Sequence, residues 1–293
     1  MITAYCEKLG FPAEAAEALT TAWQQLQTVP EADALLTLAE QRLYDSDHPG
    51  YEAALQALYA KTEVHPYTVD LLFYLRALIP LKEIYAKKGL PEDLYWNAAK
   101  DLRWKLMECH TVYGIWGTFT HWFDWFYLCK RFALGRLQFE VIEFPAEDVP
   151  GVITKGEPVL NCHIPSSGPL TKEAVIASLR QAWEFFPQLH KDGILTVHCS
   201  SWLLYQPFRE TYPQGSNLRQ FFDLFRIVES WPRSNAIDFN RVFGMNWTPD
   251  LDPDTVPQHT KLQKNIIAHL KQGGSFGAGR GLLRFDGENV ITD

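Results

Sequence analysis

The sequence lacks the features that mark membrane, secreted and metal-binding proteins. No apolar run approaches the roughly 18 residues needed to cross a bilayer, and Met1 to Tyr5 carry neither the basic flank nor the apolar core of a secretory signal. Cysteine is scarce: the five cysteines are widely spread, which predicts reduced thiols rather than disulfides or a zinc site. We therefore expect a cytoplasmic protein with no membrane partner and no metal ion.

Positive charge is also scarce. The 27 Lys and Arg residues are outnumbered by 35 Asp and Glu residues, which gives a formal net charge of -8. Binding to a nucleic-acid backbone needs clustered Lys and Arg, so we expect no nucleic-acid partner. Apolar residues, in contrast, make up 46% of the chain and aromatic residues 14%. This composition predicts a globular protein with one large core or two ordinary ones.

The first 130 residues contain almost no strand signal and predict an all-α domain over residues 1–131. Pro80 lies inside one of the helical segments and is expected to kink or split it. Apolar residues recur at helical spacing in Ala13–Leu26, Glu31–Leu43, Tyr51–Tyr59, Val69–Tyr85 and Leu94–Met107, and a very aromatic helix is expected from Gly114 to Phe132.

The pattern changes after residue 131. Leu134 to Ile142 alternates like a strand, and two more strands are predicted at Pro158–His163 and Gly193–Trp202, with a helix between them from Thr171 to Leu189. A strand, a crossover helix and a strand imply a parallel pair. Further strands are expected at Arg226–Ser230 and Asp238–Phe243, and helices at Leu218–Phe225, capped by Asn217, and after a capping box of Thr260 and Gln263.

The fold class is therefore α+β, with an N-terminal helical domain (1–131) followed by a mixed β-sheet flanked by helices (132–293). The order of elements in the second part resembles the core of the GNAT acyltransferase superfamily. The strings Phe132 to Glu140, Cys162 to Pro165, Ser201 to Leu204 and Arg241 to Gly244 resemble a two-part acyltransferase family with a helical N-terminal domain and a GNAT-like C-terminal domain. The resemblance implies acetyl-CoA or another acyl-CoA as cosubstrate and no tightly bound cofactor.

The turn after the second predicted strand is where the resemblance places CoA. GNAT proteins usually bind its pyrophosphate through a Gln/Arg-x-x-Gly-x-Gly/Ala loop, whereas this chain has one glycine there and two prolines that remove donors. The resemblance implies that Ile164, Ser166, Ser167 and Gly168 contact the cosubstrate, with the serine hydroxyls replacing missing donors. The alternative is a Pro-Ser-Gly turn that only caps a helix.

A second glycine-rich segment runs from Gly273 to Gly281. It follows a helix rather than linking a strand to a helix, which is the context that a phosphate loop requires. We therefore expect a flexible C-terminal loop. Arg280 in this loop is a candidate ligand for a CoA phosphate.

Strand alternation gives evidence that does not depend on the resemblance. Residues two apart on a strand share a face, so Glu140, His163, His198 and Ser200 form one polar patch if their strands are neighbours. Burial of unpaired polar groups costs a few kcal/mol each, so the patch is expected to line a wet cleft or to open to solvent. The alternative is an ordinary solvated face of an antiparallel sheet.

Acyl transfer to an amine needs a base, and these four residues are the catalytic candidates. Glu140 is predicted to be the general base, directly or through a water, with His163 or His198 as substitutes because a histidine titrates near neutrality. The leaving thiolate could take its proton from Ser200, Ser201 or Tyr212, and this role stays open. A thiol nucleophile at Cys199 is disfavoured, because neighbouring residues on a strand point to opposite faces.

Two functions compete. The first is an acyl-CoA-dependent N-acyltransferase that acts by direct transfer on a small-molecule amine held between the helical domain and the sheet. The second is a non-catalytic GNAT-like module that binds a ligand through an aromatic interdomain cleft. A serine hydrolase is disfavoured because the chain has no Gly-x-Ser-x-Gly motif.

Overall fold

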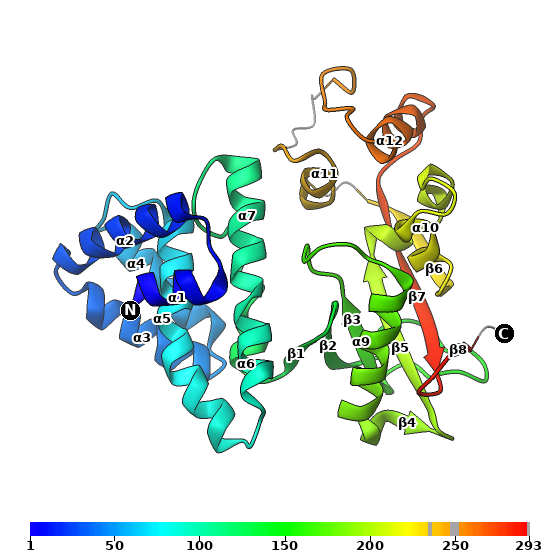
Figure 1. The fold of residues 1–293 in the computed structure, drawn as a ribbon, viewed down its shortest axis with the longest axis horizontal. Coiled ribbons are helices and arrows are strands. Elements are labelled where there is room, and N and C mark those ends of the chain that lie inside the picture. The colour runs from blue at the N-terminus through cyan, green and yellow to red at the C-terminus, as the bar shows by residue number, and fades with distance from the viewer. Residues whose placement is uncertain (234–235, 247–251, 292–293) are drawn as a thin grey trace. The chain divides into compact units, whose positions relative to one another are not determined.

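The structure of the chain, a computed structural model, describes residues 1–233, 236–246 and 252–291. The chain folds into two compact units, Met1–Phe132 and Ala133–Asp293. Figure 1 shows a helical first unit and a second unit with a sheet and helices. The predicted α+β class is confirmed.

The helical unit is built around one long helix. Helix α5 (Pro66–Lys87) buries residues on all of its sides and contacts each of the other helices of the unit, as expected for a core helix. The surrounding helices are α1 (Ile2–Leu9), α2 (Ala13–Thr28), α3 (Ala32–Tyr44), α4 (His48–Tyr59), α6 (Glu92–Ala99), α7 (Asp101–Tyr113) and α8 (Asp124–Tyr127). Helix α1 was not predicted, and the single helix expected at Leu94–Met107 is two helices, α6 and α7.

Two other helical predictions need correction. Of the two effects expected of Pro80, the split is absent, because α5 continues through Pro80, which lies beside the exposed Ile79. The segment after α7 is not one aromatic helix: only α8 is helical. Gly117 packs so closely on the backbone of Tyr67 that no Cβ would fit, and the amide of Thr118 donates to the Tyr67 carbonyl at 2.8 Å.

Buried carboxylates organise the polar groups of the helical unit. Asp124 accepts hydrogen bonds from the hydroxyls of Tyr51 and Tyr74, both at 2.7 Å. Asp70 lies on α5, and its Oδ2 is 3.6 Å from Nε2 of His121. Hydrogen bonding to Asp70 raises the pKa of His121, so this histidine binds its proton more tightly in the folded chain.

One mixed sheet organises the second unit. Its main strands follow the order β1-β2-β3-β5-β7-β6, with β4 added to β5 and β8 added to β7. Strands β3 and β5 are parallel, whereas β2–β3, β5–β7 and β6–β7 are antiparallel. The strands are β1 (Arg131–Leu134), β2 (Leu137–Glu143), β3 (Pro158–His163), β4 (His190–Lys191), β5 (Ile194–Ser201), β6 (Arg226–Pro232), β7 (Gly277–Phe285) and β8 (Val290–Ile291).

The predicted crossover is present and makes β3 and β5 neighbours. Helix α9 (Lys172–Phe185) connects them, and a short 3-10 helix (Pro187–Leu189) follows it. The expected strand over Leu134–Ile142 is instead two strands, β1 and β2, because Gly135 turns the chain at a φ of 69°. The remaining helices of the unit are α10 (Asn217–Phe222), α11 (Ala236–Phe243) and α12 (Lys261–Lys271).

Details at these helices confirm one prediction and correct two. The capping box of Thr260 and Gln263 is present at the start of α12. Helix α10 is capped by Ser216 rather than Asn217, because the Ser216 hydroxyl accepts the Arg219 amide at 3.3 Å. Residues 238–243 are helical, not extended.

Part of the glycine cluster belongs to a strand of the sheet: Gly277, Gly279 and Gly281 lie in β7, so the prediction of a flexible loop was wrong for these residues. Gly277 and Gly279 lie on one face of β7, against the segment Leu204–Tyr205. A Cβ on Gly279 would collide with the Leu204 carbonyl, and a Cβ on Gly277 with the Tyr205 ring. The glycines therefore allow backbone and ring to approach the sheet.

The opposite faces of the sheet differ in character. One face is apolar: Leu137, Phe139, Leu160 and Val197 are at most 1% exposed. On this face, the side chains of Phe225 and Leu204 pack directly on Gly281. The other face carries the polar residues described below. In the described part of the chain, no helix is both long and apolar enough to cross a membrane.

Candidate active site

The registered pairing of the parallel strands β3 and β5 covers two residue pairs, Leu160 with Val197 and Asn161 with His198. Beyond the second pair, β3 continues to His163 and β5 to Ser201. The crossover predicted this parallel pair, whose carboxyl ends lie at one edge of the sheet.

The four catalytic candidates lie on one face of the sheet, as predicted. In the register, Glu140 pairs with Asn161, Asn161 with His198, and Ser200 with Arg280. Directly paired residues share a face. His163 is two residues beyond Asn161 and therefore lies on the same face.

The patch is not the wet or solvated surface that the sequence predicted. Glu140, Asn161 and His198 are buried, at 5%, 8% and 2% exposure. His163 is partly exposed and Ser200 is exposed. The prediction failed because these polar groups bond to one another, which removes most of the penalty for burying them.

A hydrogen-bonded network joins the three strands. Nε2 of His163 lies 2.7 Å from Oε1 of Glu140, and Nδ2 of Asn161 donates to the same oxygen at 3.0 Å. On the other side, Nδ1 of His198 lies 2.8 Å from Oδ1 of Asn161. An amide oxygen can only accept, so Nδ1 of His198 carries the proton and Nε2 is left as the basic nitrogen. Asn161 therefore links the two histidines.

His198 is held in its neutral form. Burial, the charge of Arg280 and the neighbouring His163 lower the pKa of His198 to about 4. Its Nε2 is buried and has no hydrogen-bond partner among the described residues. The ring of Phe144 meets the imidazole edge-on, with centroids 5.9 Å apart. His198 is thus a neutral side chain fixed between an amide and an aromatic ring.

The loop after β3 presents free main-chain donors. Among the described residues, no protein group accepts from the amides of Ser166, Ser167 or Gly168. Arg136 braces this loop, because its guanidinium donates to the carbonyls of Gly168 at 2.9 Å and Pro169 at 3.1 Å. Free main-chain donors in a loop before a helix suit the binding of an anion.

The loop does more than cap a helix, which was the alternative. The cap of α9 is Thr171, whose hydroxyl accepts the Ala174 amide at 3.3 Å. Capping therefore does not use the donors of Ser166 to Gly168. Ile164, the other predicted contact, comes directly after β3 and is partly buried.

Arg280 lies away from this loop, on β7, with β5 between it and β3. Its guanidinium forms an ion pair with Glu229 and stacks over the ring of Trp231 at 5.3 Å. Its register partner is Ser200. The structure therefore groups Arg280 with the polar patch and not with the predicted cosubstrate loop.

The other candidate proton donors are already engaged. The hydroxyl of Tyr212 is buried and donates to the Leu203 carbonyl at 3.0 Å. Ser201 accepts the Leu203 amide at 3.2 Å. Cys199 is buried on the apolar face, as strand alternation predicted.

The sequence analysis missed two residues of this site. Asn161 links the histidines, and its position two residues before His163, on the same face of the strand, was a usable signal. The role of Arg136 in bracing Gly168 and Pro169 depends on the tertiary structure, because it joins segments far apart in the sequence.

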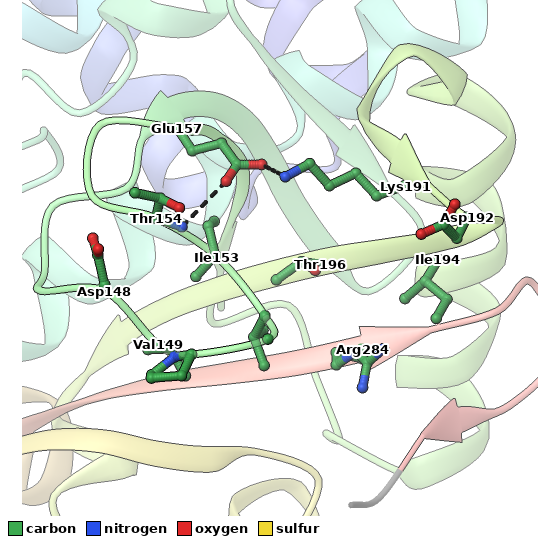
Figure 2. Close-up of a pocket in the computed structure, with 13 residues that line it drawn as sticks. Asp148, Val149, Ile153, Thr154, Glu157, Lys191, Asp192, Ile194, Thr196 and Arg284 are labelled. Atoms are coloured by element: carbon green, nitrogen blue, oxygen red, sulfur yellow. Dashed lines mark hydrogen bonds and ion pairs between the residues drawn. The ribbon is translucent and has the colours of Figure 1, made fainter.

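A cavity of about 490 Å³ lies farther along the same face of the sheet (Figure 2). Its floor includes Thr196, two residues before His198, and Arg284. Its wall is the loop from Asp148 to Glu157, and Glu157 is paired with Lys191. The cavity and the polar network therefore lie on one face of the sheet.

The family of the chain follows from comparison with known proteins. Residues 132–283 match the family model of the GNAT-like C-terminal domain. The chain belongs to this family. Residues 1–131 match the model of the N-acyltransferase N-terminal domain. The resemblance seen in the sequence is confirmed.

Solved structures agree with this fold. An acyltransferase in complex with decanoyl-CoA and teicoplanin aligns with a TM-score of 0.71 at 22% identity, covering 94% of this chain and 85% of that one. A mutant acyltransferase in complex with octanoyl-CoA aligns with a TM-score of 0.71 at 23% identity, with the same coverage. At such identity the likeness concerns the fold. Comparison with curated proteins found no match.

Proposed function

We propose that this GNAT-like protein is an acyl-CoA-dependent N-acyltransferase that transfers the acyl group directly to a primary amine. The observation that carries the proposal is the pair of Glu140 and His163, 2.7 Å apart at the carboxyl end of β3. Such a pair provides a base beside the carboxyl ends of two parallel strands. The family and its acyl-CoA-bound structural neighbours support the same reaction.

The acyl-CoA would be held by the loop after β3. The amides of Ser166, Ser167 and Gly168 have no protein partner among the described residues, and backbone donors before a helix suit a pyrophosphate. Neighbours of the same fold are seen in complex with decanoyl-CoA and octanoyl-CoA. This loop replaces the second glycine of the usual pattern with serines, whose hydroxyls add donors.

His163 is proposed to be the general base and Glu140 the residue that positions it. Glu140 is buried and its Oε1 already accepts from Asn161, so it is poorly placed to touch a substrate. His163 is partly exposed and can take a proton. The carboxylate behind it stabilises the imidazolium that forms. His198, with a lowered pKa, is a weak base at neutral pH and serves to fix Asn161.

The transfer step balances as follows. The amine nitrogen attacks the thioester carbonyl carbon, and His163 removes the proton that the nitrogen loses. The C–S bond then breaks, and the sulfur leaves as the thiolate of CoA. The thiolate takes up a proton from solvent, and the exposed hydroxyl of Ser200 is the protein group proposed to relay it. The imidazolium of His163 then returns its proton to solvent, which restores the base. The products are an amide and free CoA.

The acceptor is proposed to be a primary amine on a small molecule. A similar acyltransferase is bound with teicoplanin, so an amine carried by a glycopeptide is the second candidate. Release of the CoA thiol from acetyl-CoA in the presence of each amine tests the reaction. If acyl-CoA binds but no amine yields free CoA, the protein is a binding module. If no acyl-CoA binds at millimolar concentration, the proposal fails.

A further inference from the structure

Three buried side chains lie on one face of the sheet at the last registered pair of β3 and β5. Glu140 on β2, Asn161 on β3 and His198 on β5 are joined by hydrogen bonds of 3.0 Å and 2.8 Å. All three are less than 10% exposed. These three polar side chains form the floor that a group entering between the strand ends would meet. Their hydrogen bonds are made to one another.

The apolar face closes the same floor from the other side. Cys162 follows Asn161 on β3 and Cys199 follows His198 on β5, and both thiols are buried. Hydrogen bonding of the Cys162 thiol to the Cys199 sulfur and burial raise the pKa of Cys162, so the two side chains interact across the strands. Buried side chains therefore cover both faces of β3 and β5 at the level of the Asn161–His198 pair.

Phe144 stands behind this floor. It is 1% exposed, its ring lies edge-on to His198, and it belongs to a buried apolar cluster with Val149, Ile153 and Leu282. Val149 and Ile153 also line the 490 Å³ cavity seen in Figure 2. Phe144 and its cluster therefore separate the polar network from an existing cavity on the same face of the sheet.

We propose that Phe144, with the Asn161–His198 hydrogen bond, limits the acyl group of the donor to a short chain. The inference rests on the proposed function. In this proposal the thioester carbonyl lies at the carboxyl ends of β3 and β5, and a long acyl chain directed along the sheet would have to displace buried, hydrogen-bonded groups. An acetyl or similarly short group would not. Phe144 is then the specificity-determining residue. Its ring keeps the acyl chain of the donor out of the cavity behind it in the wild-type protein.

The physical basis is the balance between chain burial and the groups that it displaces. Each methylene group that is buried strengthens binding about fourfold. An acyl chain that has no apolar space to enter gains no binding free energy from its length. It also leaves polar groups such as His198 and Asn161 without hydrogen-bond partners. Removing the Phe144 ring opens apolar space that reaches the walls formed by Val149 and Ile153, so length then becomes favourable.

Calorimetry on the full chain tests this without knowledge of the acceptor. CoA, acetyl-CoA, octanoyl-CoA and decanoyl-CoA are titrated into wild type, Phe144→Leu and Phe144→Ala. We expect wild type to bind octanoyl-CoA at least about tenfold more weakly than acetyl-CoA. The ratio should shift toward octanoyl-CoA in Phe144→Leu and by about tenfold or more in Phe144→Ala, because each removed carbon enlarges the space.

The ratio of two affinities in one protein sample does not depend on how much of a variant is folded. Val152→Ala is the matched control: Val152 packs against the same cluster and lines the cavity, but this substitution leaves the Phe144 ring beside His198, so the ratio should not move. Tighter binding of octanoyl-CoA than of acetyl-CoA by wild type overturns the inference, as does an unchanged ratio in Phe144→Ala. Both outcomes leave the proposed function standing, whereas failure to bind CoA or any acyl-CoA overturns both.

Discussion

The imidazole of His163 lies 2.7 Å from the carboxylate of Glu140, and these residues come from neighbouring strands of one sheet. Asn161 extends this pair to His198 on the next strand, so a base and its supporting groups span β2, β3 and β5. His163 is the last residue of β3 and lies beyond the last registered pair of β3 and β5. In the mechanism that we propose, His163 transfers the proton and Glu140 positions it.

Replacing His163 should remove the base and keep the cosubstrate site. We expect His163→Gln to lower kcat/KM about 100-fold or more, which is the usual contribution of a general base. Affinity for acetyl-CoA, measured by calorimetry, should stay within about twofold because the loop Ser166–Gly168 is untouched. A parallel loss of acetyl-CoA affinity would show that His163 belongs to the binding site instead.

Glu140→Gln should have a different signature. The amide keeps a hydrogen-bonding group beside His163 but removes the negative charge that favours its protonated form. We therefore expect a smaller loss of kcat and a shift of the pH dependence of kcat/KM to lower pH. A profile that keeps the wild-type pH dependence would remove Glu140 from the mechanism.

Gly168 offers a test of the cosubstrate loop. Its φ is 117°, a conformation that an L side chain rarely adopts, and no atom lies within 4 Å of a Cβ built there. Gly168→Ala should therefore distort the loop rather than create a clash, and raise KM for acetyl-CoA several-fold with little change in kcat. Gly151→Ala is the control, because Gly151 also has a positive φ (74°) and open surroundings. Equal effects of both substitutions would contradict a role for the loop.

The lowered pKa of His198 predicts that the folded chain loses stability in acid. Its pKa falls from 6.5 to about 4 on folding, so below about pH 6.5 the unfolded chain binds a proton that the folded chain refuses. The stability is fully present above pH 6.5 and falls as the pH drops toward about 4, by up to about 3 kcal/mol. Free energies of unfolding measured from pH 4 to pH 7 should show this slope, and His198→Gln should flatten it.

His121 predicts the opposite trend in the helical unit. Asp70 raises the pKa of His121 above 6.5, so the folded chain holds a proton that the unfolded chain releases first. This contribution is fully present below about pH 6.5 and is lost as the pH rises through the raised pKa. His121→Asn should therefore destabilise the chain more at pH 6 than at pH 8.5. A destabilisation independent of pH would show that only packing was lost.

The polar face of the sheet was predictable because strand alternation depends on local geometry alone. Once the crossover made β3 and β5 neighbours, the positions of Glu140, His163, His198 and Ser200 on one face followed from the spacing of two. The network was not predictable, because it depends on Asn161 lying between two strands at hydrogen-bonding distance. The burial of the patch was missed for the same reason.

The missed strand β7 shows where local sequence patterns fail. Gly277 and Gly279 lower the strand propensity of this segment. Glycine is needed at these positions because the Leu204 carbonyl and the Tyr205 ring, which are far away in the sequence, pack directly on them. Residues 238–243 failed in a similar way: the rings of Phe239 and Phe243 contact each other at helical spacing, 4.5 Å apart, in α11. In such short segments the spacing of apolar residues does not distinguish a helix from a strand.

The most direct test of the proposed reaction is the release of free CoA from acetyl-CoA, followed with a thiol reagent over a panel of primary amines that includes amino sugars and glycopeptide amines. Wild type should release CoA together with an equal amount of acylated amine, and His163→Gln should do so about 100-fold more slowly. Release at the wild-type rate by His163→Gln, or tight binding of acetyl-CoA without release for any amine, would contradict the assignment of His163 as the base of an acyltransferase.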